Sequence, residues 1–369
     1  MMKTLATFDI NSGEGNCRNS EGAFVTLKNN RILFIHTRYQ AGRGWDHDTA
    51  DLAAWHSDDG GLTWTSDGVV IPHDDGALNY MSVSLLRLRN NRILLLFLRK
   101  SANGDGSVAC MPYRCFSDDE GASWTAPERC LKEQDACYLV VNNDRLVQLP
   151  DGRIAFAAAI TLRLWQKDHA AFGPAVCSFC CSEDNGETWS QTANLVYPVT
   201  GSGSRTGWQE PGIVSLGPNT LMMWLRNSLG YQYQSFSYDG GASWTQAAPN
   251  LFFRSPEAPL SMKRDPSDNS IVAVWDDHSP VWGTELRHDP KSHIPFWGTD
   301  RRPLVFARSL DNAASWTEHQ ILENDPDSGF CYTAIHFVGN RTLLAYCCGS
   351  KANGHGCLQD LRIRTLERE

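Results

Sequence analysis

The sequence of 369 residues lacks several features that define other classes of protein. No run of about 18 apolar residues occurs, so no helix is expected to span a membrane. The start, MMKTLATFDI, lacks the run of about 7 apolar residues that a secretory signal needs, and a cytoplasmic location is therefore expected. Basic residues are not in excess, because the formal net charge is -9. This balance disfavours binding to nucleic acid or to an anionic membrane, whereas a few convergent arginines would suffice for a small acidic substrate.

The cysteines follow no recognisable framework. Twelve are present at irregular spacing, and the tightest cluster, Cys177, Cys180 and Cys181, has no second Cys or His pair at zinc-finger spacing. We therefore interpret the cysteines as reduced thiols in the core, and we predict neither a metal nor a cofactor.

One octapeptide pattern occurs five times. Its copies follow Ser-x-Asp-x-Gly/Ala-x-Ser/Thr-Trp and occupy residues 57–64, 117–124, 182–189, 237–244 and 309–316. The Asp of such a turn can accept hydrogen bonds from backbone N–H groups, a Gly permits positive φ, and the Trp packs back onto the sheet. The copies start 55 to 72 residues apart, which is the length of a four-stranded blade with its loops. Radial repetition of this kind is typical of a β-propeller.

A second recurring unit, an apolar strand, a turn and another apolar strand, precedes each octapeptide. It occupies residues 23–34, 83–97, 146–156, 213–224 and 260–275, and a sixth copy at 333–344 has no octapeptide after it. Six such hairpins predict an all-β, six-bladed β-propeller. No Pro- or Ser-rich linker interrupts the period, so a single domain over residues 1–369 is expected. Its last blade should close the ring by pairing residues 358–365 with a strand from the N-terminal segment.

Five octapeptides on this period resemble the Asp-box, or BNR repeat, of the sialidase superfamily. The resemblance covers nearly the whole chain and implies a sialidase-like propeller. It also implies a retaining exo-glycoside hydrolase that releases a terminal sialic acid or related acidic sugar from an oligosaccharide or sialoglycan. Because Asp-boxes are structural and the same fold hosts lectins and lyases, the function has to be read from the inner strands.

Two inner stretches resemble those that carry sialidase chemistry. The stretch QEPGIVSLGPNTLMMWLRN, residues 209–227, is similar to the sialidase segment in which a Glu opens the inner strand and an Arg ends the next one. The resemblance implies that Glu210 activates the nucleophile and that Arg226 binds the sugar carboxylate. The sequence CYTAI resembles the segment that supplies the catalytic tyrosine, which implies that Tyr332 is the nucleophile.

The remaining carboxylate-binding arginines follow the family pattern less closely. In the sequence RRPL the resemblance favours Arg302 as the second arginine of the triad, with Arg301 next to it as the alternative. The first blade reads RNSEGAF where sialidases have an Arg-Ile-Pro-type strand, so the first arginine is either replaced by Arg18 or Arg38 or absent, and its absence would favour a uronic-acid substrate. Glu21, in the same stretch, is a candidate for contact with a sugar hydroxyl.

Acid–base and lining residues complete the predicted site. The loop GWDHDTAD lies where sialidases keep the acid/base aspartate, and we prefer Asp46 with Asp48 as the alternative. Asp144 and Arg145 open the inner strand of blade three and either line the pocket or form a structural ion pair. Weaker candidates are four tryptophans for sugar stacking and two histidines for a lyase reaction: Trp165, Trp208, Trp282, Trp297, His278 and His336.

These residue types suit a sugar that carries a carboxylate on its anomeric carbon. A neutral tyrosine avoids the repulsion that a carboxylate nucleophile would meet, and sialidases are for this reason an exception to the two-carboxylate pattern. Arginine binds a carboxylate bidentately and stays charged at any working pH. Two alternatives remain, a propeller glycosidase or polysaccharide lyase acting on uronic-acid glycans, and a non-catalytic carbohydrate-binding propeller. The oligomeric state does not follow from the sequence.

Overall fold

The computed structural model describes residues 2–133, 135, 137–166, 169–199, 203–204, 206–282, 301–317, 319–349, 354 and 356–368. These residues form twenty-five β-strands and one 3-10 helix, η1 (Pro280–Trp282), and contain no α-helix. In the part of the chain so described, no helix is long and apolar enough to cross a membrane.

The strands follow one another along the chain in antiparallel meanders. The first meander contains β2 (Arg18–Thr26), β3 (Ile32–Tyr39), β4 (Ala50–Ser57) and β5 (Thr65–Ile71), and the second β6 (Asn79–Arg87), β7 (Ile93–Ala102), β8 (Val108–Ser117) and β9 (Glu128–Arg129). Then come β10 (Leu139–Val140), β11 (Val147–Gln148), β12 (Ile154–Gln166), β13 (His169–Ser182) and β14 (Ser190–Gln191). The fourth contains β15 (Gln209–Ser215), β16 (Leu221–Arg226), β17 (Tyr231–Ser237) and β18 (Ala248–Arg254), and the fifth β19 (Ser261–Arg264), β20 (Ile271–Asp276), β21 (Leu304–Ser309) and β22 (Gln320–Glu323). The last combines β23 (Cys331–Val338), β24 (Arg341–Cys348) and β25 (Asp360–Arg368) with β1 (Met2–Ile10).

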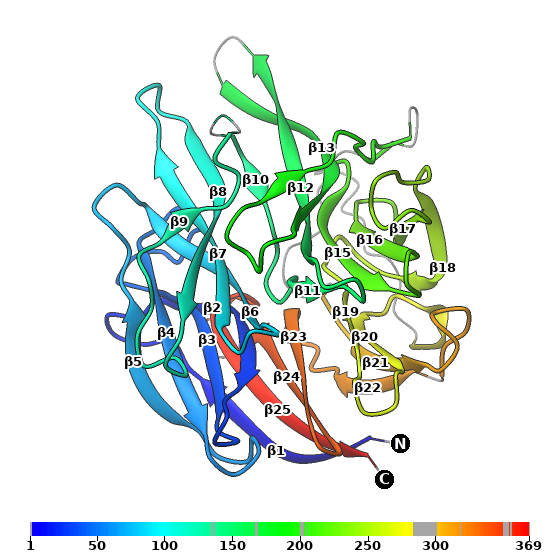
Figure 1. Cartoon of the computed structure of the whole chain (residues 1–369). Coiled ribbons are helices and arrows are strands. Elements are labelled where there is room, and N and C mark those ends of the chain that lie inside the picture. Colours follow the sequence, from blue (N-terminus) through cyan, green and yellow to red (C-terminus); the bar gives the residue numbers. More distant parts are fainter. Residues whose placement is uncertain are drawn as a thin grey trace.

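These meanders are arranged around a centre, as in a propeller (Figure 1). The innermost strands contact one another in sequence, since β2 touches β6 and β23, and β15 touches β12 and β19. Counted by hydrogen bonding, the described strands form five sheets, because a single parallel pair between Ala50 and Asn79 joins the first two meanders into an eight-stranded sheet. The all-β, propeller-like fold is therefore confirmed, while the count of six blades stays a prediction.

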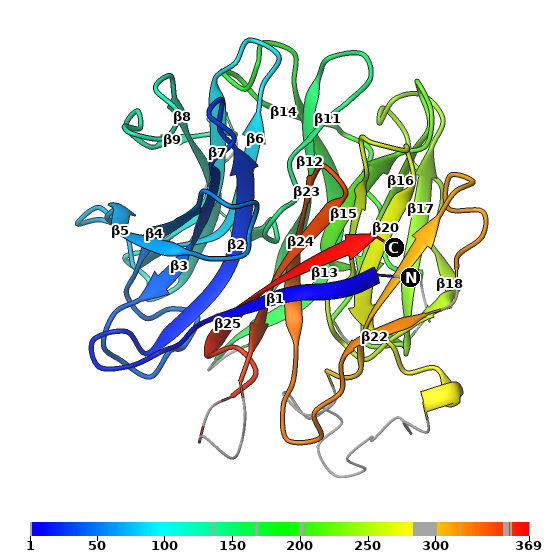
Figure 2. The ribbon, with the colours of Figure 1, turned by 90° about the horizontal axis from the view of Figure 1, so that it is seen from below.

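Each predicted strand-turn-strand unit is an antiparallel pair. The six pairs are β2–β3, β6–β7, β11–β12, β15–β16, β19–β20 and β23–β24. The predicted closure is also confirmed, because β25 pairs with β1 along its length, with Phe8 opposite Ile363. Figure 2 shows these two strands side by side. The ring is thus closed by the two ends of the described chain.

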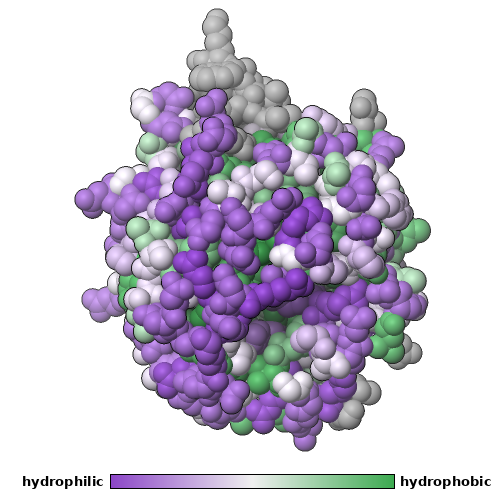
Figure 3. All heavy atoms as spheres, viewed as in Figure 1, coloured by the Kyte–Doolittle hydropathy of each residue, from purple (hydrophilic) through white to green (hydrophobic). Residues whose placement is uncertain are grey.

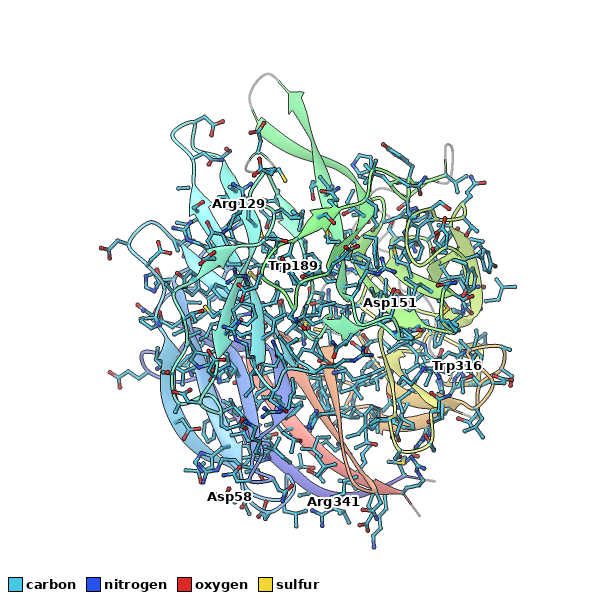
Figure 4. The ribbon with its side chains drawn as sticks, in the orientation of Figure 1. Asp58, Arg129, Asp151, Trp189, Trp316 and Arg341 are labelled. Carbon is cyan, nitrogen blue, oxygen red and sulfur yellow. The ribbon has the colours of Figure 1, made fainter. Side chains whose placement is uncertain are left out.

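The octapeptides form the self-bonded turns that the sequence predicts. In the first, Ser57 Oγ donates to Asp59 Oδ1 at 2.8 Å, and the Thr63 hydroxyl donates to Asp59 Oδ2 at 2.6 Å. The other four repeat this arrangement. Figure 4 labels Asp58 and Arg341 near each other at the lower edge, where Arg341 Nη1 donates to the Asp59 carbonyl at 2.9 Å and so links two neighbouring meanders.

The cores lie between the meanders, and the cysteines belong to them. All twelve cysteines are free thiols, and ten of them are buried. Cys180 and Cys181 sit in the apolar layers on either side of β13, which confirms that the cluster packs as small hydrophobic side chains. The surface seen in Figure 3 is mostly hydrophilic and is hollowed near its centre.

Candidate functional site

Five of the six meanders share one backbone irregularity at or just before the inner strand. Glu21, Ser82, Asp144, Glu210 and Tyr332 all have positive φ, between 42° and 59°. In β2, β6, β15 and β23 this residue lies in a break of the ladder register, which identifies it as a β-bulge residue. Bulges re-aim a side chain away from the regular alternation. Here they bring side chains of different meanders into contact at the same end of the inner strands.

Tyr332 and Glu210 form the central pair of this site. Tyr332 Oη donates to Glu210 Oε1 at 3.0 Å, although 122 residues separate them. Arg226, at the end of β16, places Nη1 2.6 Å from Glu210 Oε2 and 3.4 Å from Tyr332 Oη. All three side chains are largely buried, so the three residues predicted from the sequence lie together in one dry cluster.

The environment keeps the tyrosine protonated. Burial and the Glu210 carboxylate raise the pKa of the Tyr332 hydroxyl well above its usual range, and Arg226 and Arg301 oppose that shift. The hydroxyl is therefore neutral at any ordinary pH. To act as a nucleophile it has to transfer its proton as it reacts, and Glu210 is the acceptor that lies within hydrogen-bonding distance.

Arg301, and not the preferred Arg302, reaches this cluster. The Arg301 guanidinium lies 5.6 Å from the centre of the Tyr332 ring, and its Nη1 donates to Cys331 Sγ at 3.0 Å. Arg302 instead donates to Asn324 Oδ1 at 3.4 Å on the surface. The geometry therefore favours Arg301 over Arg302, because successive side chains of an extended segment point to opposite sides and only one of the two can face the centre.

Arg18 provides the first-blade arginine. It is 3% exposed, and its Nη1 donates to Asp46 Oδ1 at 2.6 Å. Its Nη2 lies 3.7 Å from Glu21 Oε1 and donates to Ser20 Oγ at 3.1 Å. Arg38 donates to the Gly15 carbonyl at 3.3 Å near the surface and is not part of the cluster. Of the two alternatives, the geometry therefore favours Arg18.

Glu21 faces the same space from the first inner strand. It is 4% exposed and accepts a short hydrogen bond from the Ser82 hydroxyl of β6. Burial raises the pKa of the Glu21 carboxyl, and Arg18 and Ser82 counteract that rise. Glu21 therefore offers a buried acceptor to a hydroxyl or amide of a bound molecule.

The two loop aspartates have different surroundings. Asp48 Oδ2 accepts from the backbone N–H groups of Arg43 and Trp45 at 2.9 and 3.0 Å, which is the bonding of a turn-forming aspartate. Asp46 is half exposed and bonds to Arg18. Its partial burial would raise its pKa, but Arg18 and Lys100 outweigh this effect and lower the pKa of Asp46 to about 2. The geometry therefore favours Asp46 over Asp48, and its low pKa favours the ionised form.

Asp144 and Arg145 hold the inner strands together. Asp144 Oδ1 accepts from Lys263 Nζ at 2.6 Å, and its Oδ2 accepts from the Ile335 N–H at 2.9 Å. Arg145 Nη2 donates to the Leu260 carbonyl at 2.9 Å. Their partners are backbone and side-chain atoms of neighbouring inner strands. Of the two alternatives in the sequence, the structural role is the one the geometry favours.

Comparison with known proteins places the chain in a family. A family model, BNR repeat-like domain, matches residues 25–343. The chain belongs to this family. It lies within the sialidase and BNR superfamily, as the relatives described next also indicate.

The relatives of this BNR repeat-like chain are distant. A sialidase of Paraclostridium sordellii is 24% identical over 234 residues, which cover 58% of this chain and 53% of that protein. The chain thus spans about half the length of that curated relative. A protein of unknown function from Dyadobacter fermentans has a TM-score of 0.73 at 17% identity, covering 100% of this chain and 99% of that one. A leech intramolecular trans-sialidase has a TM-score of 0.71 at 13% identity, covering 98% and 70%. At such identities the structures establish the sialidase-like fold.

Two residues that contact the candidate site, Ser82 and Lys100, were not predicted from the sequence. Ser82 precedes the octapeptide of its blade by almost the same number of residues as Glu21 precedes its own. This spacing could have identified Ser82 from the sequence. Lys100 donates from Nζ to the Asp46 carbonyl at 2.8 Å. Lys100 lies opposite Asn79, the first residue of β6, just as Arg226 lies opposite Gln209, the first residue of β15. This equivalent position in the hairpin could have identified Lys100 from the sequence.

The weaker candidates lie apart from the cluster or outside what is described. Trp208 is fully buried and its Nε1 donates to the Tyr197 carbonyl, so the prediction of a sugar-stacking loop residue is wrong. Trp282 Nε1 donates to Asp277. Trp297 and the side chain of Trp165 lie outside the described residues. His336 contacts Thr26 near the opposite ends of the inner strands, and burial lowers its pKa to about 3. His278 is buried.

Proposed function

We propose that this protein is a retaining exo-glycosidase that releases a terminal sialic acid or a related acidic sugar from a glycan. The observation that carries the proposal is the 3.0 Å hydrogen bond from Tyr332 Oη to Glu210 Oε1, with Arg226 on the other carboxylate oxygen. A tyrosine held on a base inside a cluster of arginines fits attack on a sugar that bears a carboxylate.

The reaction we propose runs through a covalent glycosyl-tyrosine. The sugar carboxylate binds to Arg18, Arg226 and Arg301, and Tyr332 Oη attacks the anomeric carbon while its proton passes to Glu210. Protonated Asp46 gives its proton to the departing glycosidic oxygen as that bond breaks. In the second half, Asp46 takes a proton from water, which attacks the anomeric carbon, and Glu210 returns the proton to the tyrosine oxygen. The configuration is retained because the anomeric carbon is inverted twice.

The resting Arg18–Asp46 ion pair adds one requirement to this scheme. With a pKa of about 2, Asp46 carries no proton to donate near neutral pH. A substrate carboxylate that binds Arg18 competes with Asp46 for the same guanidinium. Losing that partner raises the pKa of Asp46, because partial burial then acts with less opposition. Substrate binding would in this way prepare its own acid catalyst.

The same ion pair is the observation that favours a second candidate, a carbohydrate-binding propeller without turnover. If the substrate does not displace Asp46 from Arg18, the site has no proton donor for the leaving group. The alternative of a glycosidase or lyase acting on uronic-acid glycans was favoured by the apparent absence of a first-blade arginine. The position of Arg18 beside Glu21 and Asp46 weakens that argument.

We also propose that the chain forms one six-bladed domain over residues 1–369. Apart from the Ala50–Asn79 pair, the eight-stranded sheet consists of two antiparallel meanders, each with its own inner strand and its own octapeptide. Counting it as two blades gives six units, in agreement with the six hairpins.

Turnover of a sialic-acid glycoside with a fluorescent leaving group tests the proposal. Tyr332→Phe should lower kcat by about 1000-fold or more, because it removes the nucleophilic oxygen. Tyr238→Phe is the matched control, since Tyr238 is 68% exposed and lies in an octapeptide turn. If the wild-type protein binds an unsaturated sialic-acid analogue but releases no fluorophore, the carbohydrate-binding candidate replaces the glycosidase.

A further inference from the structure

A cavity lies toward the ends of the inner strands opposite to the Tyr332 cluster. Its volume is about 870 Å³. In β2 and β23 the site residues Arg18 and Tyr332 stand near the start, whereas the cavity is lined by residues near the end of each strand, including Thr26 and Phe337. The cavity is large enough for a drug-sized molecule, whose sites usually measure about 300–1,000 Å³.

The two sites are separated by bonded side chains. Asn143 Nδ2 donates to the carbonyls of Gly22 and Tyr332, at 2.9 and 3.0 Å, and so ties three inner strands together. Asp144 and Arg145 are the next two residues in the chain. They bond to backbone atoms of Ile335 and Leu260, and both line the cavity. This layer forms the floor of the cavity, which is therefore distinct from the Tyr332–Glu210 cluster.

The walls of the cavity combine apolar surface with arginines. Its apolar lining includes Phe24, Leu146 and Trp224. Three arginines belong to the lining, namely the exposed Arg89, the half-buried Arg264 and the buried Arg145. The hollow near the centre of the face in Figure 3 shows apolar side chains inside a hydrophilic rim.

Carboxylates balance only part of this positive charge. Asp144 is the single carboxylate in the described lining, and it is bonded to Lys263. Glu120 pairs with Arg87 at 2.6 Å. These two ion pairs account for two of the five cationic side chains that line the cavity.

The other three arginines bond to neutral oxygens in the described part of the chain. Arg89 Nη2 donates to the Pro150 carbonyl at 3.3 Å, Arg145 Nη2 to the Leu260 carbonyl, and Arg264 Nη1 to the Asn269 carbonyl at 2.6 Å. Burial lowers the pKa of Arg145 to about 10 and also lowers that of Arg264. At the Tyr332 cluster, by contrast, the pKa of Arg226 is raised, because Glu210 outweighs the effect of burial. The cavity therefore carries positive charge that its surroundings do not neutralise.

We propose that this cavity binds a small organic anion with an apolar body, whose acidic group meets Arg89 and Arg264 and whose apolar part packs against Trp224 and Leu146. In a chain of net charge -9, Arg89 and Arg264, which bond to neutral oxygens among the described residues, select for an anion at this place. The apolar walls give affinity to the rest of the molecule. The site is independent of the glycosidase proposal, since it shares no side chain with the proposed catalytic machinery.

A fluorescence titration with 8-anilinonaphthalene-1-sulfonate, an aromatic sulfonate, tests this inference. One saturable equivalent should bind, and Arg89→Gln should weaken it by about threefold to fivefold, the scale of one partly exposed charge pair. Arg153→Gln is the matched control, because Arg153 also bonds to a carbonyl of the next meander, Gly240, but does not line the cavity. Leu216→Trp, which fills the cavity, should abolish binding while the thermal midpoint is unchanged.

Three outcomes would overturn the inference. The first is that the neutral N-phenyl-1-naphthylamine binds as tightly as the sulfonate, which would remove the anion preference. The second is an equal loss of affinity in Arg89→Gln and Arg153→Gln, which would indicate unspecific charge. The third is unchanged binding in Leu216→Trp, or no saturable binding to the wild-type protein.

Discussion

Arg301 and Arg302 stand next to each other in the chain but occupy different environments. Arg301 is 3% exposed and lies over Tyr332, whereas Arg302 bonds to Asn324 near the surface. An arginine that binds a carboxylate in a dry site contributes far more than one in a solvated pair. The direction of a single side chain thus decides which of two identical residues belongs to the site.

We expect Arg301→Ala to lower kcat/KM for a sialic-acid glycoside by about 100-fold, as loss of a buried charge contact does. Arg302→Ala should change it by less than about threefold. Because Arg301 is buried, thermal melts of both variants have to show folded protein before the rates are compared, and Arg301→Lys should recover part of the loss. Equal effects of the two alanine variants would contradict the assignment of Arg301.

The pKa of Asp46 is expected to depend on what binds Arg18. Its pKa of about 2 lies below the ordinary 3.8, so the ion pair stabilises the folded chain above about pH 4. That stabilisation is lost as the pH falls from about 4 toward 2, where the folded-state carboxylate is protonated. A carbon NMR titration of Asp46 should therefore give a low pKa in the free protein and a higher one with a bound unsaturated sialic-acid analogue.

Two variants make the Asp46 titration decisive. Arg18→Gln should raise the pKa of Asp46 without any ligand, because it removes the charge that lowers it. Arg38→Gln, which is outside the site, should leave it unchanged. If the analogue binds and shifts other resonances but the Asp46 titration does not move, substrate binding does not prepare the acid, and the scheme proposed for catalysis loses its proton donor.

At the scale of elements, the bulge in the inner strands β2, β6, β15 and β23 is what turns a structural hairpin into a part of the site. In β2 the bulge residue Glu21 is followed by Gly22, where an added Cβ would lie 2.3 Å from Phe34 Cζ and 2.8 Å from the Ile35 carbonyl oxygen. Only glycine permits this close approach. The side chain of Phe34 thus packs directly on the backbone that aims Glu21.

We expect Gly22→Ala to lower the free energy of unfolding by about 1–3 kcal/mol, the usual cost of overpacking a core. Urea denaturation measures this change. Gly13→Ala is the control, since nothing lies within 4 Å of a Cβ at that position. A Gly22→Ala protein as stable as the control would show that the strand can retreat from Phe34 without cost.

The hairpins and octapeptide turns were predictable because each rests on local chemistry written in the sequence. Ser, Asp and Thr of an octapeptide bond to one another within eight residues, so the pattern itself carries the turn. Tyr332 and Glu210 were found through their resemblance to sialidase segments. Ser82 and Lys100 were not, because their role depends on a bulge and on contacts between different meanders, and Ser and Lys are common on any strand.

At the scale of the whole molecule, the ring places the Tyr332 cluster and the cavity toward opposite ends of the inner strands β2 and β23. In β2, for example, Glu21 of the Tyr332 site stands near the start, and Val25, which lines the cavity, stands near the end. Closure of the ring holds all these strands in register. Both sites therefore depend on the pairing of β1 with β25.

Removing β1 tests this dependence. A chain that lacks residues 1–11 exposes the edge of β25 and loses the packing of the buried Met2 and Ile10. An unpaired strand edge of this length favours association with other chains. We expect the shortened protein to lose its cooperative thermal transition and to elute as aggregates in size-exclusion chromatography.

A synthetic peptide of residues 1–12, added in trans, should restore the transition in a saturable manner, because β1 joins the sheet through backbone hydrogen bonds and side-chain packing that do not need a covalent link. A peptide with the same residues in scrambled order keeps the composition but loses the alternation that buries Ile10, and it should have no effect. If the shortened chain melts like the full chain, β1 only covers an edge. The ring would then be closed by contacts between the inner strands β2 and β23 alone.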